Sequence, residues 1–230
     1  PLPGSMPNDV YRPLRVPQEC NGLSVLETFS RLLTHLPLDY WDEQCRAGNL
    51  CDADQKSLGA TYFVKAGERL LHRHHQIIEP DVNGDITALY EDEALVVLNK
   101  PAPLPMHAGG RYTRNTLQHA LDSVYRPQKL RPAHRLDANT TGLLIIARNR
   151  HFAGRLQTQF AEGRVEKIYL VRVQGHPGED QFRCDAPIGK EPGISGTREI
   201  DESYGDQAIT LFSVVQRLSD GTSLLEARPL

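Results

Sequence analysis

The sequence has no long apolar run, no strong excess of one charge and few cysteines. No apolar stretch approaches the roughly 18 residues that suggest a membrane span, and nothing at the N-terminus resembles a secretory signal. The formal net charge of −3 argues against wholesale coating by nucleic acid but leaves room for a local basic face. We therefore expect no membrane partner, and the sequence gives no sign of an obligate protein partner.

The cysteines and histidines have no spacing typical of a metal site. The four cysteines, at positions 20, 45, 51 and 184, form no Cys-x-x-Cys pair, which favours reduced thiols in a cytoplasmic protein. The run from His72 to His75 lies in a predicted strand end or linker. Adjacent side chains on a strand point to opposite faces, so four in a row do not converge on one ion. We expect no metal.

The N-terminal third reads as a leader followed by a small module. Residues 1–20 are rich in proline and read as an extended leader, in which Pro1–Ser5 resemble a tag remnant. Residues 21–80 are predicted to form a small α/β module and linker. Its predicted elements are two helices at 23–36 and 39–46 and short strands at 60–64 and 69–71.

This pattern resembles a small RNA-binding module that is often fused to RNA-modifying enzymes. In that family the second helix and the turn after it are basic. Here the region carries Asp42, Glu43, Asp52 and Asp54 against Arg46 and Lys56. The resemblance therefore implies a weak RNA-binding face.

The sequence predicts secondary structure more clearly from residue 86 onward. A strand, an acidic turn and a second strand are predicted over residues 88–100, and Pro101 ends the second strand. Three prolines then place His107 at the end of a stiff loop, where it is a candidate substrate contact. Asn115 is predicted to cap the next helix, whose apolar stripe includes Leu117 and Leu121.

The central stretch is residues 132–142, which read PAHRLDANTTG and run directly into the apolar segment 143–147. That apolar run predicts a buried strand. Asp137 then lies in a loop that a buried strand holds in place, where functional carboxylates are common. The alternative is that Asp137 and Thr140 only satisfy backbone donors in the turn.

The remaining chain predicts one more helix and three strands. Phe152, Leu156 and Phe160 recur at four-residue spacing in a helix that ends at Gly163. Tyr169 lies on a strand predicted at 165–173, where a tyrosine among aliphatic residues is usually part of the core. Residues 175–207 read as a long loop with a short hairpin. Two strands, at 208–216 and 223–228, are predicted around a turn at Asp220-Gly221.

Three motifs together resemble the RluA-type family of RNA pseudouridine synthases. They are YEDEALVVLNKPAPLPMH from Tyr90, HRLDANTTGLL from His134 and EKIYL from Glu166, in the family's order and spacing across roughly residues 80–230. The resemblance implies an α+β fold, with a mixed, mainly antiparallel β-sheet and flanking helices. Residues 81–230 would be the catalytic domain, with Asp137 in its central cleft.

The resemblance also implies the reaction and the residues that perform it. The enzyme would isomerise specific uridines of ribosomal or transfer RNA to pseudouridine, without a metal or other cofactor. Asp137 would be the nucleophile, and Tyr169 would pack against the target base and assist the proton shift at carbon 5. Arg135 would fill the space left by the flipped uridine. Further candidate substrate contacts are His134, Lys100, His107, Thr140 and Thr141.

Two departures from the family pattern keep alternatives open. Thr141 stands where the family usually has serine, and the chain stops before the family's Gln-Ile-Arg motif, whose basic residue pairs with the catalytic aspartate. We therefore expect a shortened chain with low or no activity of its own. The alternatives are a catalytically inert RNA-binding relative and a generic α/β domain in which Asp137 is a turn residue.

Overall fold

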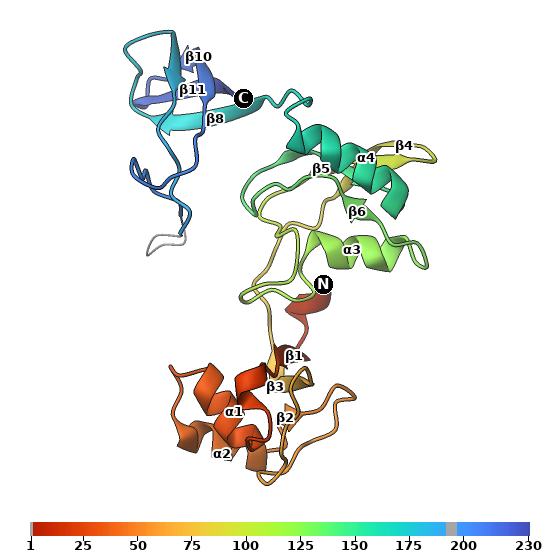
Figure 1. The fold of residues 1–230 in the computed structure, drawn as a ribbon. Helices are drawn as coiled ribbons and strands as arrows, with labels where there is room; N and C mark the ends of the chain where they lie inside the picture. The colour runs from red at the N-terminus through yellow and green to blue at the C-terminus, as the bar shows by residue number, and fades with distance from the viewer. Residues whose placement is uncertain (1, 192–196) are drawn as a thin grey trace. The chain divides into compact units, whose positions relative to one another are not determined.

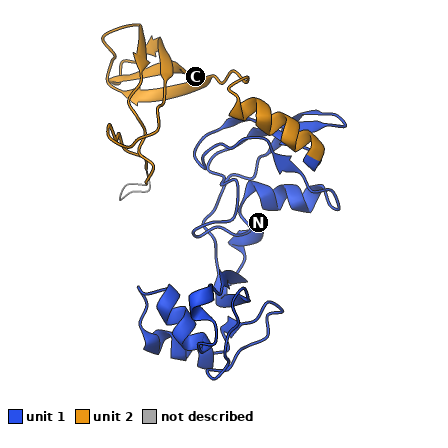
Figure 2. Cartoon of the chain, viewed as in Figure 1, with its two compact units in different colours: residues 1–150 blue, residues 151–230 orange. Residues whose placement is uncertain are grey.

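A computed structural model describes residues 2–191 and 197–230 of the chain. They form two compact units, residues 1–150 and 151–230 (Figure 2). Helices and strands are mixed, and every strand pair is antiparallel (Figure 1). The predicted α+β class is confirmed. Among the described helices, none is both long and apolar enough to cross a membrane.

The first unit begins with a small module that packs two helices against a three-stranded sheet of order β1-β3-β2. Its elements are η1 Pro3–Ser5, β1 Asn8–Arg15, η2 Gln18–Cys20, α1 Val25–Leu32, α2 Leu38–Arg46, β2 Leu50–Cys51 and β3 Arg69–Ile77. Helix α1 starts where it does because Ser24 and Glu27 form a capping box, in which each side chain accepts from the other's backbone N–H.

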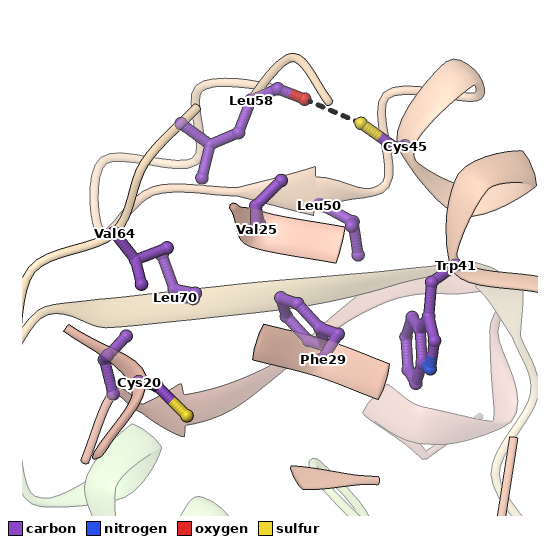
Figure 3. Packing of buried hydrophobic residues seen from close by; sticks show 10 residues of the cluster. Cys20, Val25, Phe29, Trp41, Cys45, Leu50, Leu58, Val64 and Leu70 are labelled. Carbon is purple, nitrogen blue, oxygen red and sulfur yellow. Dashed lines mark hydrogen bonds between the residues drawn. The ribbon is translucent and has the colours of Figure 1, made fainter. Parts of the chain in front are cut away.

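The module has its own hydrophobic core, shown in Figure 3. Phe29 of α1 and Trp41 of α2 are almost completely buried, with ring centroids 4.9 Å apart. Leu50 and Leu70 meet them from β2 and β3 (Figure 3). Burying two large rings in one cluster stabilises the helix–sheet contact by several kcal/mol.

The structure corrects two predictions for this module. The leader segment contains β1, which pairs with β3 over almost its whole length. Gly4, within the predicted tag remnant, is buried and its N–H donates to Asn115 Oδ1 at 2.8 Å, and the tag assignment itself stays a prediction. Residues 60–64 form no strand and contribute one isolated bridge, between Ser24 and Phe63. Apolar content alone does not make a strand when no neighbouring strand supplies hydrogen bonds.

The second part of the first unit is a four-stranded sheet of order β4-β5-β7-β6 with one helix. Its elements are β4 Thr87–Glu91, β5 Leu95–Lys100, α3 Leu117–Val124, β6 Arg131–Pro132 and β7 Gly142–Ala147. The predicted pair of strands and the apolar strand after Asp137 are present. Helix α3 is capped by Thr116, whose hydroxyl accepts from His119 N, and not by the predicted Asn115. Asn115 is buried and bonds Gly4 instead.

The second unit carries another four-stranded sheet, of order β8-β11-β10-β9. The elements of this region are α4 Arg150–Ala161, β8 Tyr169–Gln174, β9 Gln181–Cys184, β10 Thr210–Arg217 and β11 Thr222–Pro229. The final hairpin and its turn at Asp220-Gly221 are confirmed, with Gly221 at a φ of +81°. Part of the predicted loop 175–207 lies outside the described residues. The predicted division at residues 20 and 80 stays a prediction.

The buried histidine of β3 predicts acid sensitivity. His72 is 6% exposed, and burial, aided by His74 and Arg12, lowers its pKa to about 4. The pKa of His74 is lowered in the same direction. The unfolded chain therefore binds protons more readily than the folded chain below pH 6.5. We expect the unfolding free energy to fall by about 3 kcal/mol between pH 6.5 and 4 on account of His72.

The single tryptophan, Trp41, lies 5.2 Å from the His72 ring and reports this unfolding by fluorescence in urea. His72→Gln should flatten the acid limb of the stability curve, while the exposed control His35→Gln should leave it unchanged. Equal pH profiles for the wild type and His72→Gln would contradict the prediction.

Candidate active site

Two paired strands of the first unit, β5 and β7, position the candidate site. Strand β5 pairs with β7 in a register that sets Lys100 opposite Gly142. Alternate residues of each strand are buried, Val96 and Leu98 on β5 and Leu144 and Ile146 on β7. This shared apolar face holds the strand ends rigidly, and the loop 133–141 enters β7 at that end.

The backbone of the loop 133–141 is tied down at several points. Ala133 N–H donates to Ile145 O at 2.8 Å, and Leu104 N–H donates to Ala138 O at 2.8 Å. Within the loop, Thr140 N–H donates to Asp137 O at 3.1 Å. The side chain of Leu136 is buried beside them. A loop with this many backbone bonds presents its side chains in a defined geometry.

Lys100 is the main anchor of this loop. Its side chain is 0% exposed, and its Nζ donates to the carbonyl oxygens of Pro101 at 2.9 Å, Ala138 at 3.2 Å and Thr140 at 2.8 Å. All three ammonium protons are used. Burial lowers the pKa of Lys100, and the negative charge of Asp137 partly opposes that shift. The buried cation therefore interacts with both the backbone and the carboxylate of the loop.

The Asp137 side chain itself is exposed on this fixed backbone. Its main-chain oxygen is engaged in the turn, while its carboxylate faces solvent and can reach an incoming ligand. The alternative of a purely structural turn residue predicts a carboxylate that accepts backbone N–H bonds, as Asp92 does from Ala94 and Leu95. The described contacts of the Asp137 carboxylate include no such bond.

The other predicted contacts divide into exposed and engaged residues. Arg135, His107 and Thr141 are exposed, and Thr140 is partly exposed. His134 is half-buried, and its Nε2 accepts from Ile145 N–H at 3.2 Å, so it holds the loop against β7. Lys100 is buried, which does not fit the expected contact with RNA. Its role in this structure is to position the loop.

The burial of Lys100 had a signal in the sequence that the motif-based reading missed. Side chains of a strand alternate between faces, so residue 100 shares the face of Val96 and Leu98. A lysine on the apolar face of a strand needs internal acceptors. Two of the three acceptors, the main-chain carbonyls of Ala138 and Thr140, lie about 40 positions along the chain, and no residue type marks them.

Tyr169 belongs to the second unit, at the start of β8 and in register with Ala227 of β11. It is partly exposed, on the same side of the strand as Val171 and Val173. Its phenol therefore stands at the rim of an apolar face.

No three His, Cys, Asp or Glu residues gather as potential metal ligands in the described ranges 2–191 and 197–230. The candidate site thus consists of one exposed carboxylate, exposed cationic and hydroxyl side chains, and a buried lysine behind them. Such a set is suited to covalent or electrostatic chemistry by the carboxylate.

Fold and site together define an α+β domain with an exposed carboxylate on a loop tied to antiparallel strands. The family model described as RNA pseudouridylate synthase matches residues 94–230. The chain belongs to this family. It is 32% identical over 215 residues to pseudouridylate synthase RPUSD2 of Homo sapiens and 32% identical over 219 residues to RNA pseudouridine synthase 7 of Arabidopsis thaliana.

These alignments cover 91% of this chain but 38% and 54% of the two relatives, so the chain spans about half their length or less. A solved structure, human RNA pseudouridylate synthase domain containing 1, is similar with a TM-score of 0.53 at 27% identity, covering 66% of this chain and 62% of that one. A second solved structure, human RNA pseudouridylate synthase domain containing 4, is similar with a TM-score of 0.50 at 26% identity, covering 62% of this chain and 58% of that one.

The anchoring role of Lys100 predicts a large stability effect. Lys100→Met keeps an unbranched side chain, one atom shorter, but leaves the carbonyls of Ala138 and Thr140 without their buried donor. We expect a loss of about 2–4 kcal/mol in unfolding free energy, measured by urea denaturation followed by circular dichroism. Lys129→Met, at an exposed position, is the control and should stay within about 0.5 kcal/mol. If the Lys100→Met chain is as stable as the wild type, the proposed anchoring of the loop 133–141 by Lys100 is wrong.

Proposed function

We propose that this chain contains the catalytic machinery of an RNA pseudouridine synthase in which Asp137 is the nucleophile. The observation that carries the proposal is the exposed Asp137 carboxylate on a loop fixed by buried Lys100. Family membership supports the reaction class, and the HRLD motif supports the assignment of Asp137.

The isomerisation needs few protein groups other than a carboxylate in a fixed position. The bond from the ribose anomeric carbon to N1 of uracil breaks, the base rotates, and carbon 5 bonds to the same ribose carbon. The proton on carbon 5 leaves, and N1 gains a proton, so the product is an isomer of the substrate. Asp137 either adds to the sugar or stabilises positive charge on it while the base is free. The reaction consumes no oxidant, reductant or metal.

Tyr169 and Arg135 have distinct roles in the proposal. Tyr169 stacks on the detached base and assists removal of the carbon 5 proton, since a phenol combines an aromatic face with a proton-transferring oxygen. Arg135 precedes Asp137 by two positions and is exposed, which suits a side chain that occupies the space of a flipped uridine. Thr140, Thr141, His107 and His134 are proposed as further substrate contacts.

The substrate of the proposed enzyme is ribosomal or transfer RNA, acted on in the cytoplasm. The four cysteines are free thiols, which supports a reducing compartment. The names of relatives, such as RNA pseudouridine synthase 7, support RNA as the substrate class and leave the particular uridine open. The second candidate is a catalytically inert RNA-binding relative of the family.

Asp137→Asn should abolish pseudouridine formation while leaving the fold intact. We expect a rate loss of more than about 10³-fold, because the amide is a poor nucleophile and carries no charge. Pseudouridine is mapped by chemical labelling in RNA treated with the chain, and with a version extended by a segment carrying the family's Gln-Ile-Arg motif. Asp54→Asn, an exposed aspartate of the N-terminal module, is the control. Unchanged activity of Asp137→Asn would refute the proposed nucleophile, and binding without turnover in every version would favour the inert relative.

Tyr169→Phe separates stacking from proton transfer. The ring remains, so RNA affinity should change by less than about threefold, while turnover should fall by about 10²–10⁴-fold, the range of a lost acid or base. Tyr169→Leu should weaken both. Single-turnover rates at saturating RNA measure the chemical step. Wild-type turnover in Tyr169→Phe would restrict the phenol to a packing role.

A further inference from the structure

The segment that precedes Asp137 is basic in a chain that is acidic overall. The 30 residues from His107 to Leu136 contain six Lys or Arg residues and one acid, Asp122, whereas the whole chain has a net charge of −3. Asp122 already accepts from Gln118 Nε2 at 2.9 Å. This segment ends immediately before Asp137, so the local charge is opposite to that of the rest of the chain.

The cations of this segment have no ion-pair partners. Outside it, nine Lys or Arg side chains form salt bridges, for example Arg73 with Asp9 and Arg148 with Glu91. Within the described parts of the chain, none of the six cations between 107 and 136 does so. We call five of them the cationic belt, leaving Arg135 to the site. The belt comprises Arg111, Arg114, Arg126, Lys129 and Arg131.

The belt has two groups, one in the segment before α3 and one in the segment after it. Arg111 and Arg114 precede the helix, and Arg126, Lys129 and Arg131 follow it. All are exposed except Arg131, which is partly exposed and donates to Lys129 O at 3.3 Å. Helix α3 has eight residues, so its axis spans about 12 Å between the groups.

The backbone under the first group is held by a buried carboxylate. Glu79, 2% exposed, accepts through Oε2 from Thr113 N–H and Asn115 N–H, both at 2.8 Å, and through both oxygens from Arg114 N–H. Arg12 Nη2 donates to Gly110 O at 3.1 Å on the other side of the loop. The loop is therefore ordered before any ligand binds, which lowers the entropic cost of binding.

We propose that the cationic belt binds the sugar–phosphate backbone of RNA that flanks the target uridine. Unpaired, exposed cations on a fixed backbone are suited to phosphates, which an arginine fork binds through two N–H groups. Arg131, the last residue of the belt, precedes Asp137 by six positions in the same compact unit, so this end of the belt belongs to the segment that carries the proposed nucleophile. The inference rests on the proposed function for the identity of the ligand.

The N-terminal module is a poorer candidate for this backbone contact. Residues 21–80 contain six Lys or Arg residues against eight Asp or Glu residues. Arg46 and Arg73 of that module are engaged by Asp42 and Asp9. The belt should therefore supply more of the sequence-independent affinity for RNA than the module that resembles an RNA-binding domain.

The test is the affinity of the chain for a labelled RNA hairpin with a uridine-rich loop, measured across salt concentrations. The two belt variants are R111Q/R114Q and R126Q/K129Q. The control, K56Q/K65Q, removes the same charge from exposed positions of the N-terminal module. Each belt variant should bind about tenfold more weakly at about 100 mM salt, and its slope of log affinity against log salt should fall by about 1.4–1.8. The control should stay within about twofold.

Other outcomes separate the belt from the proposed reaction. Arg126→Lys keeps the charge and should bind within about threefold of the wild type, which excludes a folding defect at that site. If the belt variants keep the wild-type RNA affinity and salt slope, the proposal that the belt binds RNA is wrong, even if Asp137→Asn abolishes turnover. Equal losses in belt and control variants would also overturn it. Anionic lipid vesicles bound in preference to the hairpin would assign the belt to a membrane surface and refute the RNA proposal. If the belt variants bind RNA weakly while the Asp137→Asn chain keeps normal turnover, RNA binding by the belt is upheld and the role of Asp137 as nucleophile is refuted.

Discussion

The candidate active site depends on one buried cation. Lys100 donates to the carbonyls of Pro101, Ala138 and Thr140 from a fully buried position at the end of β5. A buried ammonium is costly unless every proton is bonded, so the conformation of the loop and the position of Lys100 are stable only together. The exposed Asp137 carboxylate is thereby held on a rigid support.

Ion pairing differs between the basic segment 107–136 and the rest of the chain. In the described residues outside that segment, eight of the fifteen arginines form a salt bridge, as Arg172 does with Asp220 and Arg217 with Asp180. The cations leading to Asp137 lack such partners in the described residues, and a buried Glu79 orders the backbone beneath two of them. An acidic chain can in this way present a basic surface at one place.

Patterns of apolar residues predicted the elements around the site well. Local signals, namely the periodicity of apolar residues and a proline or glycine at an element's end, mark four of them. These are the strand after Asp137, the strand before Pro101, the helix ending near Gly163 and the last hairpin. Predictions failed where partners are distant in sequence. The leader forms β1 because β3, some 60 residues away, supplies its hydrogen bonds. Thr116 caps α3 because Asn115 is occupied by Gly4.

The sequence by itself determined the α+β class, the family and Asp137 as the candidate nucleophile, because these depend on local periodicity and on a contiguous motif. Tertiary structure alone decided which groups Lys100 binds, since the carbonyls of Ala138 and Thr140 come from a distant loop. It also decided that His72 is buried beside Trp41 while His75, three residues further on, is exposed. Burial and ion pairing arise from contacts between distant segments, which the order of residues in one segment does not encode.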